Sequence, residues 1–208
     1  MWWKFVQKPV RVDITIFDRI NPGEWEASKK LDGHRLILIR DGNNIRFFTR
    51  QKNIIEIPHN MREDLQKLNL PSGTVLDGEI WNNDKRGSWR TNLDSTCYAS
   101  FWDIIRFGEK DLSTLPLTER RKYLSDTVPD GLESLSVVPA AIPSLSNYLE
   151  WQKEAKDHRE KTGAKSGFIH GMVLKRKMSP RRDHATQSKV HPDWVKLVFS
   201  QMESGWQG

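Results

Sequence analysis

Lys30-Leu31-Asp32-Gly33-His34-Arg35 is the most informative stretch of this sequence, because it has the spacing K-x-D-G-x-R. An ordinary lysine amine has a pKa near ~10.4, so very little of it is neutral at pH 7. Burial and neighbouring cations lower such a pKa and turn the amine into a nucleophile. An arginine five residues later is suited to hold a phosphate by two hydrogen bonds. The stretch therefore predicts a nucleophilic lysine beside a phosphate, although a strand that ends in a solvated Asp-Gly turn has the same pattern.

Short strands separated by turns are predicted downstream of this stretch. Residues 36–39 are an apolar run, Asp41-Gly42-Asn43 signals a hairpin turn, and residues 45–48 form the returning strand. Other strands are expected at residues 54–57, 74–81, 98–105, 172–177 and 194–199. A basic polar stretch, residues 178–189, lies between the last two strands.

Three helices are expected between these strands, at residues 59–69, 119–125 and 147–161. Thr118 is a suitable N-cap for the second helix and Ser146 for the third, which Gly163 would end. Strands in blocks with inserted helices, rather than strict alternation, predict an α+β fold with largely antiparallel sheets.

The composition is that of a basic globular protein. Its 208 residues are enough for one good core, and the net charge of +6 favours a polyanionic partner. A single cysteine, Cys97, excludes an intrachain disulfide framework and paired-cysteine zinc sites. No apolar run approaches the ~20 residues that span a bilayer, and the first residues lack the apolar region of a signal peptide. We expect a soluble cytoplasmic protein (bacterial, or in the host cytoplasm if viral) without a membrane partner.

The motif order of the whole chain resembles the covalent nucleotidyltransferases, which comprise ATP-dependent DNA ligases, RNA ligases and mRNA capping enzymes. Lys30 to Arg35 resembles the nucleophile motif of this family. Phe48-Thr49-Arg50 is similar to the family's Ser-Arg pair, Leu76-Asp77-Gly78-Glu79-Ile80 to its D-G-E motif, and Phe101 to Ile105 to its F-D strand. Leu115 to Arg121 is similar to its P-L-x-x-R-R segment, Gly171 to Lys175 to its E-G-x-V-x-K motif, and Trp194-Val195-Lys196 to its closing W-x-K-x-K motif.

The resemblance implies one adenylation domain over residues 1–208, with two largely antiparallel sheets and flanking helices. The OB-fold domain that normally follows in the family is not expected in this sequence, which is a departure from the family pattern. It implies that Lys30 attacks ATP, assisted by Mg²⁺ or Mn²⁺, and becomes a lysyl–AMP intermediate. The AMP would then be used to seal nicks between a 5′-phosphate and a 3′-hydroxyl in duplex DNA. A partner that supplies an OB-fold or clamp function is a further expectation.

The resemblance also implies roles for individual residues. Lys175 and Lys196 are expected at the α-phosphate, Glu79 at the ribose or a metal ion, and Trp102 at the adenine ring. The full set of expected nucleotide-binding residues is Ser28, Arg35, Arg50, Glu79, Trp102, Lys175 and Lys196. Contacts to nucleic acid are expected from Arg35, Arg50, Arg176, Lys177, Arg181 and Arg182. Metal ligands are expected at Glu79 and His170.

The sequence departs from the family pattern at several positions. His170 stands where the family has a metal-linked Glu, and Val198 stands where it has a second lysine. Ser28 replaces the Glu that DNA ligases usually present to the adenine amino group, and a hydroxyl there is more similar to capping enzymes or some RNA ligases. RNA joining, GMP transfer to RNA ends and a nucleic-acid-binding module without activity therefore stay open as alternatives. Arg35 directly after D-G-x favours a DNA ligase.

Overall fold

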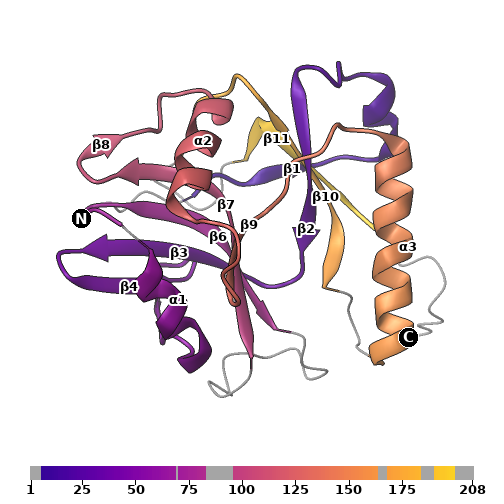
Figure 1. Cartoon of the computed structure of the whole chain (residues 1–208). Helices are drawn as coiled ribbons and strands as arrows, with labels where there is room; N and C mark the ends of the chain where they lie inside the picture. Colours follow the sequence, from indigo (N-terminus) through magenta and orange to yellow (C-terminus); the bar gives the residue numbers. More distant parts are fainter. Residues whose placement is uncertain (1–5, 69, 83–95, 164–167, 184–189, 200–208) are drawn as a thin grey trace.

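The computed structural model describes residues 6–68, 70–82, 96–163, 168–183 and 190–199, which form two β-sheets with flanking helices (Figure 1). Within these residues the strand pairs are antiparallel except β1 with β11 and β7 with β9. The predicted α+β fold with two largely antiparallel sheets is therefore confirmed.

The larger sheet has the strand order β5-β4-β3-β6-β7-β8, and β9 pairs with β7. Its strands are β3 (His34–Asp41), β4 (Asn44–Phe48), β5 (Ile54–Ile55), β6 (Val75–Asn82), β7 (Cys97–Phe107), β8 (Lys110–Asp111) and β9 (Leu135–Val137). One face packs against the short helix η2 (His59–Met61), α1 (Arg62–Lys67) and α2 (Leu117–Thr127). Burial of the apolar side chains between them supplies the main core of the molecule.

The smaller sheet has the order β1-β11-β10-β2. It consists of β1 (Pro9–Arg11), β2 (Trp25–Leu31), β10 (Ile169–Arg176) and β11 (His191–Val198), and a short helix η1 (Ile14–Asp18) lies between β1 and β2 in sequence. Helix α3 (Leu145–Thr162) packs against one face of this sheet through Tyr148, on the right-hand side of Figure 1. The opposite face is left for the site described below.

Asp32 and Gly33 carry the chain from the smaller sheet into the larger one, because β2 ends at Leu31 and β3 begins at His34. A Cβ atom on Gly33 would collide with the backbone oxygen of Ile80 and lie 2.9 Å from Trp81 Cβ. Only glycine therefore permits this close approach to β6. The Asp-Gly pair that the sequence suggested as a simple turn is the crossing point between the two sheets.

Most of the predicted elements are present with small changes in their bounds. The hairpin turn lies between β3 and β4, where Gly42 has a φ of 57° that glycine adopts readily. The helix predicted at residues 59–69 appears as η2 followed by α1. Gly163 ends α3 with a φ of 64°, as expected.

The predicted helix caps are corrected. Ser144 caps α3, because its side chain accepts a hydrogen bond from the Asn147 amide, and Ser146 lies inside the helix. Thr118 also lies inside its helix, which begins after Pro116. No strand was predicted at β1, β8 or β9, and a strand that ends at the Asp-Gly pair, as β2 does, was only the alternative interpretation of the Lys30 motif. Residues 184–189 of the basic polar stretch lie outside the described residues.

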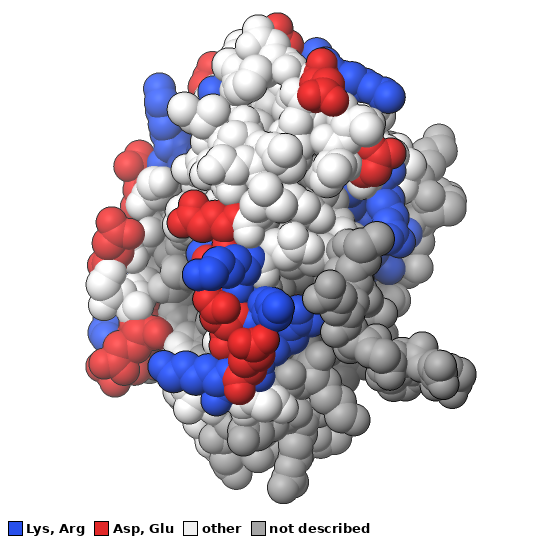
Figure 2. Space-filling view, turned by 90° about the vertical axis from the view of Figure 1, so that its right-hand side faces the viewer, with Lys and Arg blue, Asp and Glu red and all other residues white. Residues whose placement is uncertain are grey.

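The surface on the α3 side carries acidic and basic side chains close together (Figure 2). Lys153 and Asp157 pair along α3 at 3.6 Å, and Lys29 on β2 reaches Glu154 on α3 at 2.6 Å. The charges in the described part of this face are therefore mixed in sign, unlike the one-sign surface that follows a polynucleotide backbone. No helix among the described residues is long and apolar enough to cross a membrane.

Candidate active site

One face of the smaller sheet brings together residues that lie far apart in sequence. Side chains alternate between the faces of a strand, so residues paired in register across neighbouring strands share a face. The three register rows on the face opposite α3 are Lys30, Gly171 and Val198; Ser28, Val173 and Lys196; and Glu26, Lys175 and Trp194. Period-two spacing within the strands therefore brings Lys175 and Lys196 to the same face as Lys30.

The larger sheet supplies the other wall of a cavity of about 370 Å³, a size typical of small-molecule sites. Arg35 on β3 and Glu79 on β6 are register partners, and Trp102 on β7 lies nearby in the same wall. All eight residues expected to attack or bind the nucleotide line this cavity: Ser28, Lys30, Arg35, Arg50, Glu79, Trp102, Lys175 and Lys196.

Lys30 lies near the end of β2, close to the acidic Glu79 and the basic Lys196. Burial raises the pKa of the Glu79 carboxyl to about 7, and the positive charges of Arg35 and Lys30 act in the opposite direction. Burial lowers the pKa of Lys196, and the charge of Lys30 lowers it further. Lys30 is thus close enough to both groups to affect their ionisation, and it lines the cavity on the face of β2 opposite α3.

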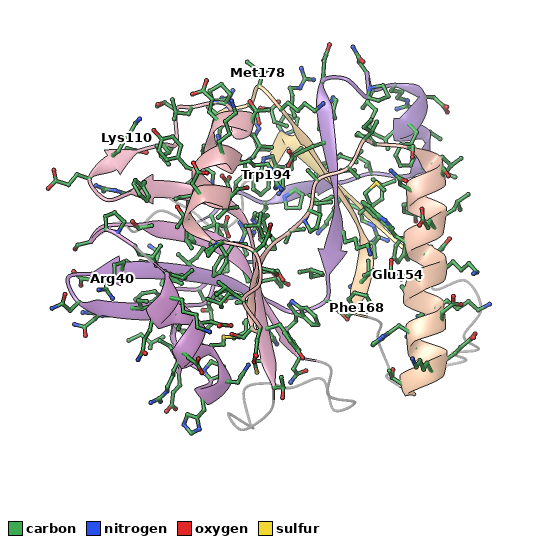
Figure 3. The ribbon with its side chains drawn as sticks, in the orientation of Figure 1. Arg40, Lys110, Glu154, Phe168, Met178 and Trp194 are labelled. Carbon is green, nitrogen blue, oxygen red and sulfur yellow. The ribbon has the colours of Figure 1, made fainter. Side chains whose placement is uncertain are left out.

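Lys175 is buried between two indole rings. Its Nζ lies 4.8 Å from the centre of the Trp194 ring and 5.6 Å from that of Trp102, and Figure 3 places Trp194 between the two sheets. Desolvation by burial lowers the pKa of Lys175 to about 7. Among the described residues Lys175 Nζ, Trp102 Nε1 and Trp194 Nε1 have no hydrogen-bond partner. Unpartnered buried donors at a cavity fit a polar ligand such as a nucleotide.

Arg35 is held in place by a carboxylate. Its guanidinium makes a two-point ion pair with Asp77, which is fully buried, and lies 4.8 Å from the centre of the Trp102 ring. Contact with an aromatic face is favourable for a guanidinium. Arg35 therefore reaches the cavity with its orientation fixed by Asp77 and Trp102.

Arg181 is not available to nucleic acid, contrary to the sequence expectation. Its side chain is completely buried and pairs with Asp77 at 2.5 Å, Asp103 at 2.9 Å and Asp183 at 2.7 Å. Arg120 on α2 completes the cluster with a 2.8 Å contact to Asp103. A buried charge needs such partners, so Arg181 has a structural role beneath the cavity.

This cluster of Asp77, Asp103, Arg120 and Arg181 was not predicted from the sequence. A signal was present, because each aspartate interrupts an apolar β-strand, in Leu76-Asp77-Gly78-Glu79-Ile80 and in Phe101 to Ile105. A charged residue at an interior strand position requires a buried partner. The sequence does not reveal which arginine that partner is.

Of the other basic residues expected to contact nucleic acid, Arg35 and Arg50 line the cavity, whereas Arg176, Lys177 and Arg182 lie outside its lining. Arg176 Nε is 3.5 Å from Asp193, and Arg182 Nε is 3.7 Å from the same carboxylate. Lys177 Nζ donates to the Gly23 carbonyl at 2.9 Å. These contacts hold the three side chains near the surface, and their role toward DNA stays a prediction.

Only one of the two expected metal ligands lines the cavity. Glu79 lines the cavity, whereas His170 does not; its side chain is 46% exposed and its Nδ1 lies 3.3 Å from Asp32 Oδ1. The described residues contain no cluster of three or more His, Cys, Asp or Glu placed to hold a metal ion. A single carboxylate still fits Mg²⁺ when phosphates and water supply the other ligands.

Comparisons with known proteins give a family match and several similar sequences. Residues 7–196 match the family model described as "ATP dependent DNA ligase domain". The chain is 25% identical over 201 residues to the SPbeta prophage-derived DNA ligase-like protein LigB of Bacillus subtilis (strain 168), covering 89% of the chain and 68% of that protein. It is 28% identical over 201 residues to DNA ligase 2 of Methanosarcina mazei, covering 88% of the chain but 35% of that protein.

Solved structures show the same fold. The mycobacterial DNA ligase D complexed with ATP and MES superimposes with a TM-score of 0.62 at 20% identity, over 93% of this chain and 60% of that one. The ATP-dependent DNA ligase of bacteriophage T7 gives a TM-score of 0.58 at 14% identity, over 93% and 68%. The chain thus spans about a third of the Methanosarcina protein and 60% of the ligase D chain. The family match over residues 7–196, together with these relatives, shows that the chain belongs to the family of ATP-dependent DNA ligase domains.

Proposed function

We propose that this domain transfers AMP from ATP to Lys30 and then to the 5′-phosphate of a nick in duplex DNA. The observation that carries the proposal is that Lys30 and the seven residues expected to bind the nucleotide all line one cavity between the sheets. Membership in the ligase family and relatives named as DNA ligases support the same reaction.

The first step is an in-line displacement at the α-phosphorus of ATP. The neutral amine of Lys30 forms a nitrogen–phosphorus bond, the amine proton passes to solvent, and the bond to the β-phosphate oxygen breaks. Pyrophosphate leaves with that electron pair. Lys175 and Lys196 line the cavity with Lys30, so their positive charges stabilise the charge that develops on the α-phosphate.

The adenine and ribose have candidate partners in the same cavity. The Trp102 ring offers an aromatic face for a base, a contact that every base can make. Glu79 lies next to Lys30 and Gly33, whose amide donates to it at 3.2 Å. It would hold either a ribose hydroxyl or Mg²⁺ (or Mn²⁺), which when bound supplies charge neutralisation for the phosphates. We leave His170 out of this set because it does not line the cavity.

In the second half of the reaction AMP passes from Lys30 to the nick phosphate, and a 3′-hydroxyl displaces it. Arg50, which lines the cavity, would contact that phosphate. Arg176, Lys177 and Arg182, nearer the surface, would contact the DNA backbone. Phosphate contacts of this kind are independent of base sequence and weaken with salt. A partner with OB-fold or clamp function would add further backbone contacts.

A second candidate is transfer to RNA ends. It is favoured by Ser28, which is buried in the cavity wall on the same face of β2 as Lys30. A hydroxyl both donates and accepts hydrogen bonds, so it selects less strictly between purines than a carboxylate does.

The proposal is tested by incubating the protein with ATP or GTP labelled at the α-phosphate, in Mg²⁺ or Mn²⁺, followed by a denaturing gel. We expect an acid-labile adduct from ATP that is lost in Lys30→Ala. Lys153→Ala, on the exposed side of α3, is the matched control and should label fully. Label from GTP alone would favour transfer to RNA ends, and no label with either metal would contradict the proposal.

A further inference from the structure

Two basic residues at the start of the chain, Lys8 and Arg11, extend the positive charge of the cavity beyond the residues considered so far. They flank Pro9, which lines the cavity. Arg11 is the last residue of β1, the edge strand of the smaller sheet, and it is the register partner of Lys196 on β11. The Val12 amide donates to the Lys196 carbonyl at 3.0 Å, which fixes this pairing.

The register places Arg11 and Lys196 on the same face. Adjacent strands lie about 4.8 Å apart, so the long side chain of Arg11 can meet any group that Lys196 contacts. On this face β11 itself presents Trp194, Lys196 and Val198, of which Lys196 alone is charged. Arg11 therefore supplies a second cation at this edge of the cavity.

The positive charges around Lys196 are those expected of a site that binds an anion. The charges of Lys30, Arg11, Arg50 and Lys8 all act on Lys196 and, after burial, lower its pKa. The charge of Arg50 adds to burial in lowering the pKa of Lys8. Within the described residues none of these five cations forms an ion pair, whereas Asp77 is engaged by Arg35 and Arg181. Unpaired like charges held close together repel one another, and a polyanion placed among them removes that cost.

We propose that Arg11, assisted by Lys8, binds the β- and γ-phosphates of ATP and holds the pyrophosphate as it leaves. In an in-line displacement the leaving group lies opposite the attacking atom. Lys30 attacks from β2 at one edge of the sheet, and β11 and β1 lie across the sheet from it. The phosphates beyond the α-phosphate are therefore directed toward Lys196 and Arg11.

This inference rests on the proposed function, and its first consequence is selectivity between ATP and AMP. AMP carries only the phosphate that Lys30, Lys175 and Lys196 would hold, so it should not use Arg11. The binding test uses calorimetry with Mg²⁺ in the Lys30→Ala background, where no adduct forms. There Arg11→Ala should weaken ATP binding about tenfold or more, since a charge-assisted hydrogen bond contributes ~1.5–3 kcal/mol. It should weaken AMP binding less than about twofold. Arg11→Lys should recover part of the loss.

Arg62→Ala, an exposed arginine at the start of α1, is the charge-matched control and should leave both affinities unchanged. Arg11 is itself exposed, so the unfolding midpoint of Arg11→Ala should equal that of the parent. An equal loss of ATP and AMP affinity, or no loss of either, would overturn the assignment.

A second arm separates ATP phosphates from DNA phosphates. Sealing of a nick that already carries AMP on its 5′-phosphate uses no ATP, so Arg11→Ala should seal it within about twofold of wild type. A large loss there would assign Arg11 to the nick and refute the proposal. If wild type forms no adduct but Arg11→Ala still lowers the ATP affinity relative to the AMP affinity, the phosphate subsite is supported and the proposed function is refuted. If the adduct forms normally in Arg11→Ala, the subsite is refuted and the proposed function is not.

Discussion

Arg181 and Asp103 form a fully buried ion pair of 2.9 Å although they lie 78 positions apart in the sequence. Arg181 belongs to the segment after β10 of the smaller sheet, and Asp103 lies on β7 of the larger one. The Arg181 guanidinium also pairs with Asp77, and Asp77 in turn pairs with Arg35, which contacts the Trp102 ring. The relative position of the two cavity walls therefore depends on this pair.

Loss of the Arg181 guanidinium should destabilise the protein. Arg181→Leu leaves Asp77, Asp103 and Asp183 with less positive charge in a buried environment, and breaking a buried pair costs about 3–5 kcal/mol. Arg182→Leu, at a side chain that is 51% exposed, should change the free energy of unfolding by less than about 0.5 kcal/mol. Urea denaturation of both variants measures the difference, and equal midpoints would show that the cluster contributes nothing.

Gly33→Ala should prevent formation of the site. The added methyl group would meet the Ile80 backbone, which cannot move without disturbing β6, and it lies close to Glu79 Cγ as well. Overpacking costs about 1–3 kcal/mol and more where backbone is involved. Gly23→Ala is the control, because its nearest contact is the Asn21 side chain at 3.2 Å. Thermal unfolding and adduct formation should both fall in Gly33→Ala alone; normal labelling would contradict the close approach.

Trp102 should contribute to nucleotide affinity through its ring. Trp102→Ala removes the aromatic face, and since stacking on a base is worth ~1–3 kcal/mol, we expect Kd for ATP to rise about tenfold or more. Trp102→Phe retains a ring and should recover most of the affinity. Calorimetric titration checks both variants. If the Ala and Phe variants bind ATP equally well, the ring does not contact the base.

Lys175 should make stability rise with pH. Its pKa is lowered by burial from 10.5 to about 7 in the folded protein, so between these values the unfolded chain binds more protons than the folded one. Stability must then increase as pH rises from about 7 toward 10.5, with one pKa unit worth about 1.36 kcal/mol. Lys175→Met should be more stable at pH 7 and lack this rise, while losing adduct formation. Urea titrations at pH 7 and 9 test it, and parallel curves for both proteins would exclude a buried, shifted lysine.

Sequence motifs identified the candidate site residues. The resemblance of Lys30 to Arg35 and of the later motifs to a known family implied eight residues, and these line one cavity. Turn chemistry also located the hairpin at Gly42 and the end of α3 at Gly163. These signals are readable because backbone conformation and side-chain alternation depend on a few neighbouring residues.

The tertiary structure alone decided which charged residues are buried and which face the ligand. Arg181 looked like a surface cation in a basic stretch. It is enclosed by Asp77 and Asp103 from the larger sheet and by Asp183, two residues further along its own segment. Arg11 showed no functional pattern in the sequence, yet the parallel pairing of β1 with β11 sets it beside Lys196. Burial and charge pairing depend on contacts between segments that are distant in the chain. The spacing of residues along one segment does not predict those contacts.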